Sequence, residues 1–187
     1  MENNNKEKKI LDILWDWVKT LAVALFITFF IKIFIFDATR VSGDSMLNTL
    51  HSGDMLFVNK IGKHFKDYKR GEIVIINAPD YPNRLYIKRV IGTPGDTVEL
   101  RDGEVYVNDE LLKEDYIGAD VTLPTSDMDS WTLSANEYLV FGDNRSNSND
   151  SRSFGKIYKE DIVGHAFVRF YPFSDAGLID NDPYKNN

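Results

Sequence analysis

The chain has no cysteine among its 187 residues. Disulfide bonds and thiolate metal sites are therefore excluded, and a folded part outside the cell must rely on its hydrophobic core. Clustered positive charge is also missing. The net charge is −7, and residues 1–36 contain five lysines against four acidic residues, so the acidity lies in the rest of the chain. An acidic domain argues against nucleic acid as a partner, because phosphate binding needs clustered cations.

Long hydrophobic runs are scarce, with one exception. Val18–Phe36 spans 19 residues, near the minimum for crossing a bilayer. Lys32 interrupts the run close to its end, where a lysine side chain can reach the lipid headgroups. Four lysines lie before or at the start of the run and Arg40 alone closely follows it, which predicts a cytoplasmic tail over 1–17 and an extracytoplasmic domain over 37–187. A buried core helix and a cleaved secretory signal are the alternatives.

The rest of the chain has the pattern of short strands separated by turn signals. Asp102-Gly103, between two alternating segments, is a strong signal for a type I′ hairpin. We also expect a helical turn at Lys159–Ile162, an irregular stretch over 118–130 and surface chain after Phe173. The predicted strands are Ala38–Val41, Met55–Asn59, Ile73–Asn77, Leu85–Ile91, Thr97–Arg101, Glu104–Asn108, Tyr138–Phe141 and Ile162–Tyr171. The predicted fold is mainly β, with a single N-terminal transmembrane helix before it.

Ser45 and Lys88 are candidates for chemistry. Ser45 follows the apolar run by nine residues, so it lies within about 30 Å of the end of the run and its substrate must come to the membrane surface. Lys88 shares a strand face with Tyr86 and Val90. Desolvation lowers a lysine pKa from about 10.4, and a neutral lysine can serve as the base for a serine nucleophile. Taken alone, however, each residue favours a simpler interpretation, which is an ordinary loop or cap serine for Ser45 and an exposed strand lysine for Lys88.

A third segment, Gly142–Arg152, is polar and begins directly after an apolar strand. Its composition is typical of a solvated loop. Asp150 and Arg152 are nevertheless spaced to form a bracing ion pair. Three hydroxyls of the segment are candidates for holding a neutral lysine amine: those of Ser146, Ser148 and Ser151.

Four segments together resemble the motifs of the type I signal peptidases: Gly43–Leu50, Gly71–Val74, Tyr86–Asp96 and Gly142–Arg152. The order and spacing of these segments match the family, as does the apolar run that precedes them. The resemblance extends from about Leu14 to Phe173. The resemblance implies a membrane-bound serine endopeptidase with two antiparallel β-sheets. It would remove signal peptides from secreted precursors at the outer surface of the cytoplasmic membrane, as in the compact Gram-positive forms. It implies no metal and no cofactor.

The resemblance also implies roles for individual residues. Ser45 would be the nucleophile and Lys88 the general base. Ser148 would orient the lysine amine, and Asp150 and Arg152 would brace its loop.

The expected substrate is an extended cleavage region that pairs with exposed strand edges near Thr39–Gly43 and Leu85–Ile87. Shallow apolar pockets would accept small side chains at the first and third positions before the bond. The residues expected to bind the substrate are Val41, Gly43, Met46, Leu50 and Ile87.

Two positions depart from the family pattern. Members usually have proline where Asn48 stands, and some have serine where Gly43 stands, with a hydroxyl that completes the oxyanion hole. Here we expect the oxyanion hole to rely on backbone N–H groups, such as that of Ser45.

Three other interpretations are considered. A histidine-assisted hydrolase would use one of the three histidines (His51, His64 and His165), but all lie outside the matched motifs. The self-cleaving repressors use a similar Ser-Lys pair, but they have DNA-binding or short soluble segments instead of an apolar run. The third is a catalytically silent, membrane-anchored binding module of the same fold. Retention of Ser45 and Lys88 counts against it, while Gly43 and Asn48 keep it open.

Overall fold

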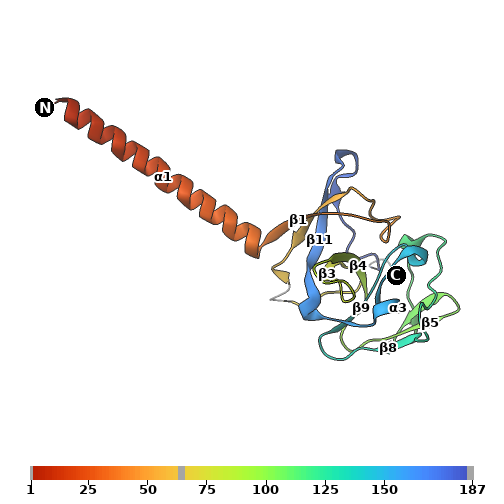
Figure 1. Cartoon of the computed structure of the whole chain (residues 1–187). Coiled ribbons are helices and arrows are strands. Elements are labelled where there is room, and N and C mark those ends of the chain that lie inside the picture. The colour runs from red at the N-terminus through yellow and green to blue at the C-terminus, as the bar shows by residue number, and fades with distance from the viewer. Residues whose placement is uncertain (1, 63–65, 185–187) are drawn as a thin grey trace. The chain divides into compact units, whose positions relative to one another are not determined.

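The computed structural model describes residues 2–62 and 66–184 and divides into two compact units, of which the first ends at Phe36 and the second begins at Asp37. The first unit contains one helix, α1 (Glu2–Phe34; Figure 1). Between Ile13 and Phe29 its large apolar side chains are more than half exposed. Among the described residues, no helix combines the length and the apolarity needed to cross a bilayer. The span proposed over Val18–Phe36 stays a prediction.

The second unit is built from two antiparallel sheets, which confirms the predicted mainly β fold (Figure 1). The strands of the larger sheet lie in the order β1 (Phe36–Arg40), β2 (Met55–Asn59), β11 (Ile162–Tyr171), β3 (Ile73–Asn77), β4 (Leu85–Gly92), β9 (Glu137–Phe141) and β10 (Ile157–Tyr158), with β12 (Gly177–Leu178) paired to β11. The smaller sheet has the order β7 (Glu110–Leu111), β6 (Glu104–Val107), β5 (Thr97–Arg101) and β8 (Ser130–Thr132).

The larger sheet is covered on both faces near its centre. Side chains alternate between the two faces of a strand, and in β3 Ile73 and Ile75 enter one buried cluster while Val74 and Ile76 enter another. A third cluster joins the two sheets. Lys88 on β4 is paired with Val74, so the backbone places this lysine within the covered part of the sheet.

Most of the predicted strands are found within two residues of their predicted ends. Asp102 and Gly103 connect β5 to β6 with φ of +53° and +85°, as a type I′ turn requires, so the hairpin prediction is confirmed. The predicted helical turn is present as Lys159–Asp161. The sequence pattern missed four strands of two or three residues (β7, β8, β10 and β12) and the short helix α3 (Ser151–Phe154).

The expectation of surface chain after Phe173 is wrong for Ile179–Tyr184. The Asn181 side chain accepts a hydrogen bond from the Ile73 N–H and donates one to the Ala166 carbonyl, both at 2.8 Å. Ile179 packs on the core cluster of β3. The segment therefore packs against β3 and β11 and supplies hydrogen-bond partners to their backbone groups.

Candidate active site

Ser45 lies in the loop between β1 and β2 and is held from both sides. The Asn144 N–H donates to the Ser45 carbonyl at 3.1 Å, and the Asn144 side chain donates to the Asp44 carbonyl at 3.0 Å. The next residue, Met46, is 1% exposed and anchors the loop in the core. Gly43 has a φ of +98°, a left-handed conformation that glycine adopts at no steric cost. These contacts fix the Ser45 backbone relative to the segment that follows β9.

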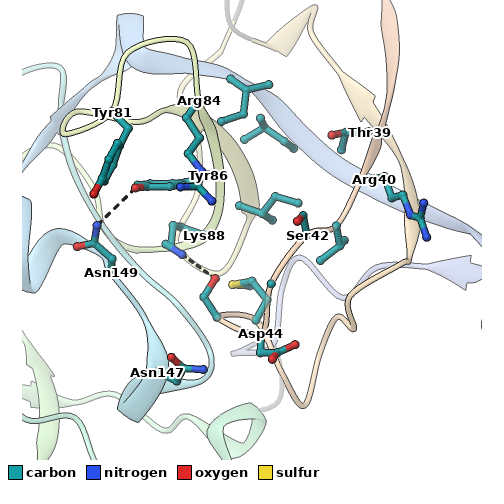
Figure 2. Close-up of a pocket in the computed structure, with 17 residues that line it drawn as sticks. Thr39, Arg40, Ser42, Asp44, Tyr81, Arg84, Tyr86, Lys88, Asn147 and Asn149 are labelled. Carbon is teal, nitrogen blue, oxygen red and sulfur yellow. Dashed lines mark hydrogen bonds between the residues drawn. The ribbon is translucent and has the colours of Figure 1, made fainter.

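The structure brings Ser45 and Lys88 together. The Lys88 Nζ lies 2.8 Å from the Ser45 Oγ, within hydrogen-bonding distance. In Figure 2 the dashed line that starts at the Lys88 amine marks this contact. These two residues are 43 positions apart in the chain, and the contact joins the loop after β1 to the middle of β4.

Lys88 is 3% exposed. Burial disfavours the charged ammonium and lowers the pKa of Lys88 to about 8, although the carboxylates of Asp150 and Asp143 act in the opposite direction. None of the described carboxylates forms an ion pair with it. About a tenth of the amine is therefore neutral at pH 7, far more than for a lysine with the ordinary pKa, and a general base needs this neutral form.

Ser148 lies close to the Ser45 loop, and Gly142, the residue directly after β9, lies against both. A Cβ on Gly142 would collide with the Ser148 Oγ and with the Ser45 carbonyl oxygen. The Ser148 Oγ is buried and makes no hydrogen bond of normal geometry with any described residue, but its hydroxyl lies close enough to Asp150 to help lower the pKa of that carboxyl. The absence of a side chain at Gly142 thus lets the Ser45 loop and the Ser148 loop pack against each other.

Asp150 and Arg152 form a buried, two-pronged ion pair with two nitrogen–oxygen distances of 2.8 Å. Arg152 also donates to the Arg145 carbonyl at 2.7 Å, while Asp150 accepts from the Gly142 N–H at 3.0 Å. Burial opposes the charged carboxylate, but hydrogen bonds from Arg152 hold the pKa of Asp150 below its usual range. The pair therefore ties the end of β9 to helix α3.

Two further buried ion pairs frame the site, and neither was among the predicted site residues. Arg89 clamps Asp143 with distances of 2.9 and 2.7 Å, and Asp143 also accepts from Thr49 at 2.5 Å. Arg145 clamps Glu114 with distances of 2.8 and 2.6 Å. Arg89 and Arg145 both lie in segments that resemble family motifs. Their acidic partners, however, are 54 and 31 residues away in the chain, and sequence pattern alone does not identify these partners.

A groove of about 530 Å³ opens above the Ser45–Lys88 contact (Figure 2). One wall comes from residues 39–46 and the other from Tyr81, residues 84–88 and the asparagines at 147 and 149. Four of the five expected substrate-binding residues line it: Val41, Gly43, Met46 and Ile87. The fifth, Leu50, does not line this groove. It is 1% exposed and packs in the core beneath the loop, beside a second cavity.

Asn48 has a φ of +80°, which the proline ring cannot adopt because it holds φ near −65°. Its side-chain amide donates to the Ile117 carbonyl at 3.3 Å. The departure from the family pattern at this position therefore accompanies a loop conformation that excludes proline. In this chain the Ser45 loop is attached through the Asn48 side chain to the segment after β7.

The histidines are not part of the Ser45 surroundings described by the structure. His51 is exposed and His165 lies on β11, and neither forms a hydrogen bond with Ser45. His64 lies outside the described residues. Within residues 2–62 and 66–184, no group of three or more His, Asp or Glu side chains is arranged to hold a metal ion.

Known proteins resemble the chain over nearly its whole length. The profile of the family described as "Signal peptidase, peptidase S26" matches residues 14–171. Signal peptidase I P of Bacillus subtilis subsp. natto is 38% identical over 90% of this chain and 95% of its own length. Signal peptidase I S of Bacillus subtilis is 38% identical over 93% of this chain and 96% of its own length. A signal peptidase I structure from Enterococcus faecalis, 32% identical, covers 54% of this chain and 97% of that chain with a TM-score of 0.45.

These matches define the class of the protein as a serine endopeptidase. The chain belongs to the signal peptidase I family. That family is associated with membranes and acts on secretory precursor proteins.

Proposed function

We propose that this chain removes signal peptides from secreted precursors with Ser45 as the nucleophile and Lys88 as the general base. The observation that carries the proposal is the distance of 2.8 Å between the Ser45 Oγ and the Nζ of Lys88, a buried lysine that forms no ion pair with any described residue. A lysine in this state can accept the serine proton without a histidine.

Neutral Lys88 removes the proton from the Ser45 hydroxyl while the Oγ forms a bond to the scissile carbonyl carbon. The resulting ammonium of Lys88 returns the proton to the leaving amine when the carbon–nitrogen bond breaks, which leaves an acyl-enzyme. Lys88 then takes a proton from water, whose oxygen attacks the ester, and the Ser45 hydroxyl is regenerated. Each proton taken by Lys88 is returned within the cycle.

The negative oxygen of the tetrahedral intermediate needs preorganised donors. The Ser45 N–H makes no hydrogen bond to another described residue and is available for this role. At Gly43 no side chain supplies a hydroxyl, and a serine there would be strained at a φ of +98°. We infer that backbone N–H groups form the oxyanion hole in this chain.

Ser148, Asp150 and Arg152 would act on Lys88 indirectly. The Ser148 hydroxyl is our candidate to hold the neutral amine in position, because it is buried against Gly142 beside the Ser45 loop and makes no hydrogen bond of normal geometry with any described residue. Asp150 and Arg152 would keep the Ser148 loop in place through their ion pair.

The cleavage region of the precursor would bind as an added strand in the groove. β9 pairs with β4 only at Arg89–Gly92, which leaves the β9-side edge of Leu85–Lys88 free for such a strand. The opposite wall is the segment around Val41. Apolar side chains of Val41, Met46 and Ile87 would restrict the first and third positions before the bond to small residues, as in a small-x-small site.

The apolar part of α1 would attach the enzyme to the lipid bilayer as a single span over Val18–Phe36, with 1–17 cytoplasmic and 37–187 extracytoplasmic. Supporting this, side chains such as Phe26 and Phe29 are 69% and 64% exposed, and exposing so much apolar surface to water is unfavourable. On the domain itself, Phe173 and Leu178 are more than 80% exposed. Alkaline extraction and protease protection of the N-terminal tail in spheroplasts would test the anchor and its orientation.

The function is tested by incubating the detergent-solubilised protein with a secretory precursor that bears an Ala-x-Ala site. The parent protein is expected to cleave after the second alanine, and the Ser45→Ala protein is expected to be inactive. If the folded parent left the precursor intact, the proposal would be wrong and a catalytically silent binding module would be favoured.

A further inference from the structure

The groove has an unpaired positive charge on the wall that carries Lys88. Arg84 lines this wall, and its guanidinium carbon lies 5.7 Å from the ring centre of Tyr81 and 6.0 Å from that of Tyr86. Among the described residues Arg84 forms no ion pair. The neighbouring Asp80 carboxylate instead accepts from the Asn149 amide at 2.5 Å. The two aromatic rings therefore hold the guanidinium in place by cation–π contacts while leaving its charge available to a ligand.

The direction of a bound strand follows from the sheet. From Arg89 onward the β9-side edge of β4 is occupied by β9, so an added strand can lie only along the segment before Arg89, which is Leu85–Lys88 of β4 and the adjoining Arg84. With the scissile carbonyl at Ser45 and Lys88, the residues before the bond then run from Ile87 back toward Arg84. This step rests on the proposed binding of the cleavage region in the groove.

Paired residues on adjacent strands point to the same face of a sheet. If the first residue before the bond lies beside Ile87, the second lies beside Tyr86, the third beside Leu85 and the fourth beside Arg84. The first and third side chains then face the apolar side, as a small-x-small site needs. The second and fourth face the side of Tyr86 and Arg84.

We propose that Arg84 is a specificity-determining residue that selects an acidic side chain at the fourth position before the scissile bond and disfavours a basic one. Figure 2 shows Tyr81, Arg84, Tyr86 and Lys88 together on one side of the groove. Arg40, the other arginine of the groove, lies on the opposite side, where its guanidinium approaches Gly53. Arg84 is thus the cation that the fourth side chain meets.

Three peptides that differ only by Glu, Gln or Lys at the fourth position of an Ala-x-Ala site test the proposal. We expect kcat/KM of the parent protein to be about threefold to tenfold higher for Glu than for Lys, as attraction and repulsion at an exposed site predict. The difference is expected to shrink at about 1 M salt, where the Debye length is short. Arg84→Gln should remove the difference, and Arg84→Glu should reverse it. A gain in rate on the Lys peptide cannot come from misfolding.

Lys113→Gln is the matched control, because Lys113 is exposed, lies outside the groove and carries the same charge. It should leave the ranking of the peptides unchanged. Equal rates for the three peptides, an unchanged ranking in Arg84→Glu, or loss of the ranking in Arg40→Gln instead would overturn the proposal. Peptide affinity for the Ser45→Ala protein gives a second measure of the ranking that needs no catalysis. Failure of cleavage would therefore count against the proposed function, and absence of charge preference in binding would count against Arg84.

Discussion

Lys88 and Arg89 are neighbours on β4 and are almost equally buried, with 3% and 1% exposure. They point to opposite faces of the strand, where their charged groups have different surroundings. Arg89 faces a carboxylate, donates to the Gly71 carbonyl at 2.7 Å and lies 4.1 Å from the ring centre of Tyr116. Lys88 faces a serine hydroxyl and has no ion-pair partner among the described residues. Burial lowers the pKa of Lys88. Burial also acts to lower the pKa of Arg89, but Asp143 together with Tyr116 and Tyr184 raises it above its usual value.

The comparison teaches which property makes a buried cation reactive. A fully paired charge stays charged and stabilises a fixed geometry, while an unpaired buried amine loses its proton readily. In this chain Arg89 holds β4, Asp143 and Thr49 together, and the proposed chemistry would take place at Lys88 on the other side of the strand. The predictions below alter one side at a time.

The largest effect is expected for Lys88→Met, which keeps an apolar chain of similar length but removes the amine. Cleavage of an Ala-x-Ala precursor should fall by about 10³-fold or more, since the base is lost. The melting temperature should stay the same or rise, because no ion pair is broken. Activity measured beside thermal unfolding separates the two effects. Normal activity of this variant would rule out Lys88 as the base.

Arg89→Met should, in contrast to Lys88→Met, lower the stability of the fold. It leaves the buried Asp143 carboxylate without its partner, and breaking a buried ion pair costs about 3–5 kcal/mol of stability. Chemical unfolding should show the loss. A double variant with Asp143→Leu removes both charges and should recover much of that stability. If the single and double variants were equally unstable, the ion pair would not be the cause.

Asn48→Pro should have a smaller effect on stability, which acts through the Ser45 loop between β1 and β2. Although proline matches the usual family sequence, it cannot adopt a φ of +80°, so we expect a loss of about 1–3 kcal/mol and a lower rate. Asn48→Gly is the matched control, since glycine adopts this φ and loses only the hydrogen bond to Ile117. A proline variant as stable as the glycine variant would contradict this account of the loop.

Sequence pattern predicted what depends on local or alternating signals. The hairpin at Asp102-Gly103 and strands such as Ile73–Asn77 follow from turn chemistry and periodicity. Ser45 and Lys88 were identified from motif resemblance and from the apolar neighbours of the lysine, and the structure places them in contact.

The remainder depends on contacts between distant residues. Strands of two or three residues, such as β10, are too short for a periodic signal. The frame of Arg89 and Asp143 could not be predicted, because their pairing is set by the register of β4 and β9. The attachment of Asn181 to β3 likewise joins residues 108 positions apart.

The central claim is that Lys88 acts as a neutral base because it is buried and forms no ion pair with any residue that the structure describes. The pH dependence of kcat/KM for the parent protein tests it most directly, since this parameter reports groups of the free enzyme. The folded pKa of about 8 lies below the ordinary lysine value, so activity should rise about tenfold per pH unit up to roughly pH 8 and then level off. A rate that continued to rise to pH 10, or one that did not change between pH 6 and 9, would contradict the account.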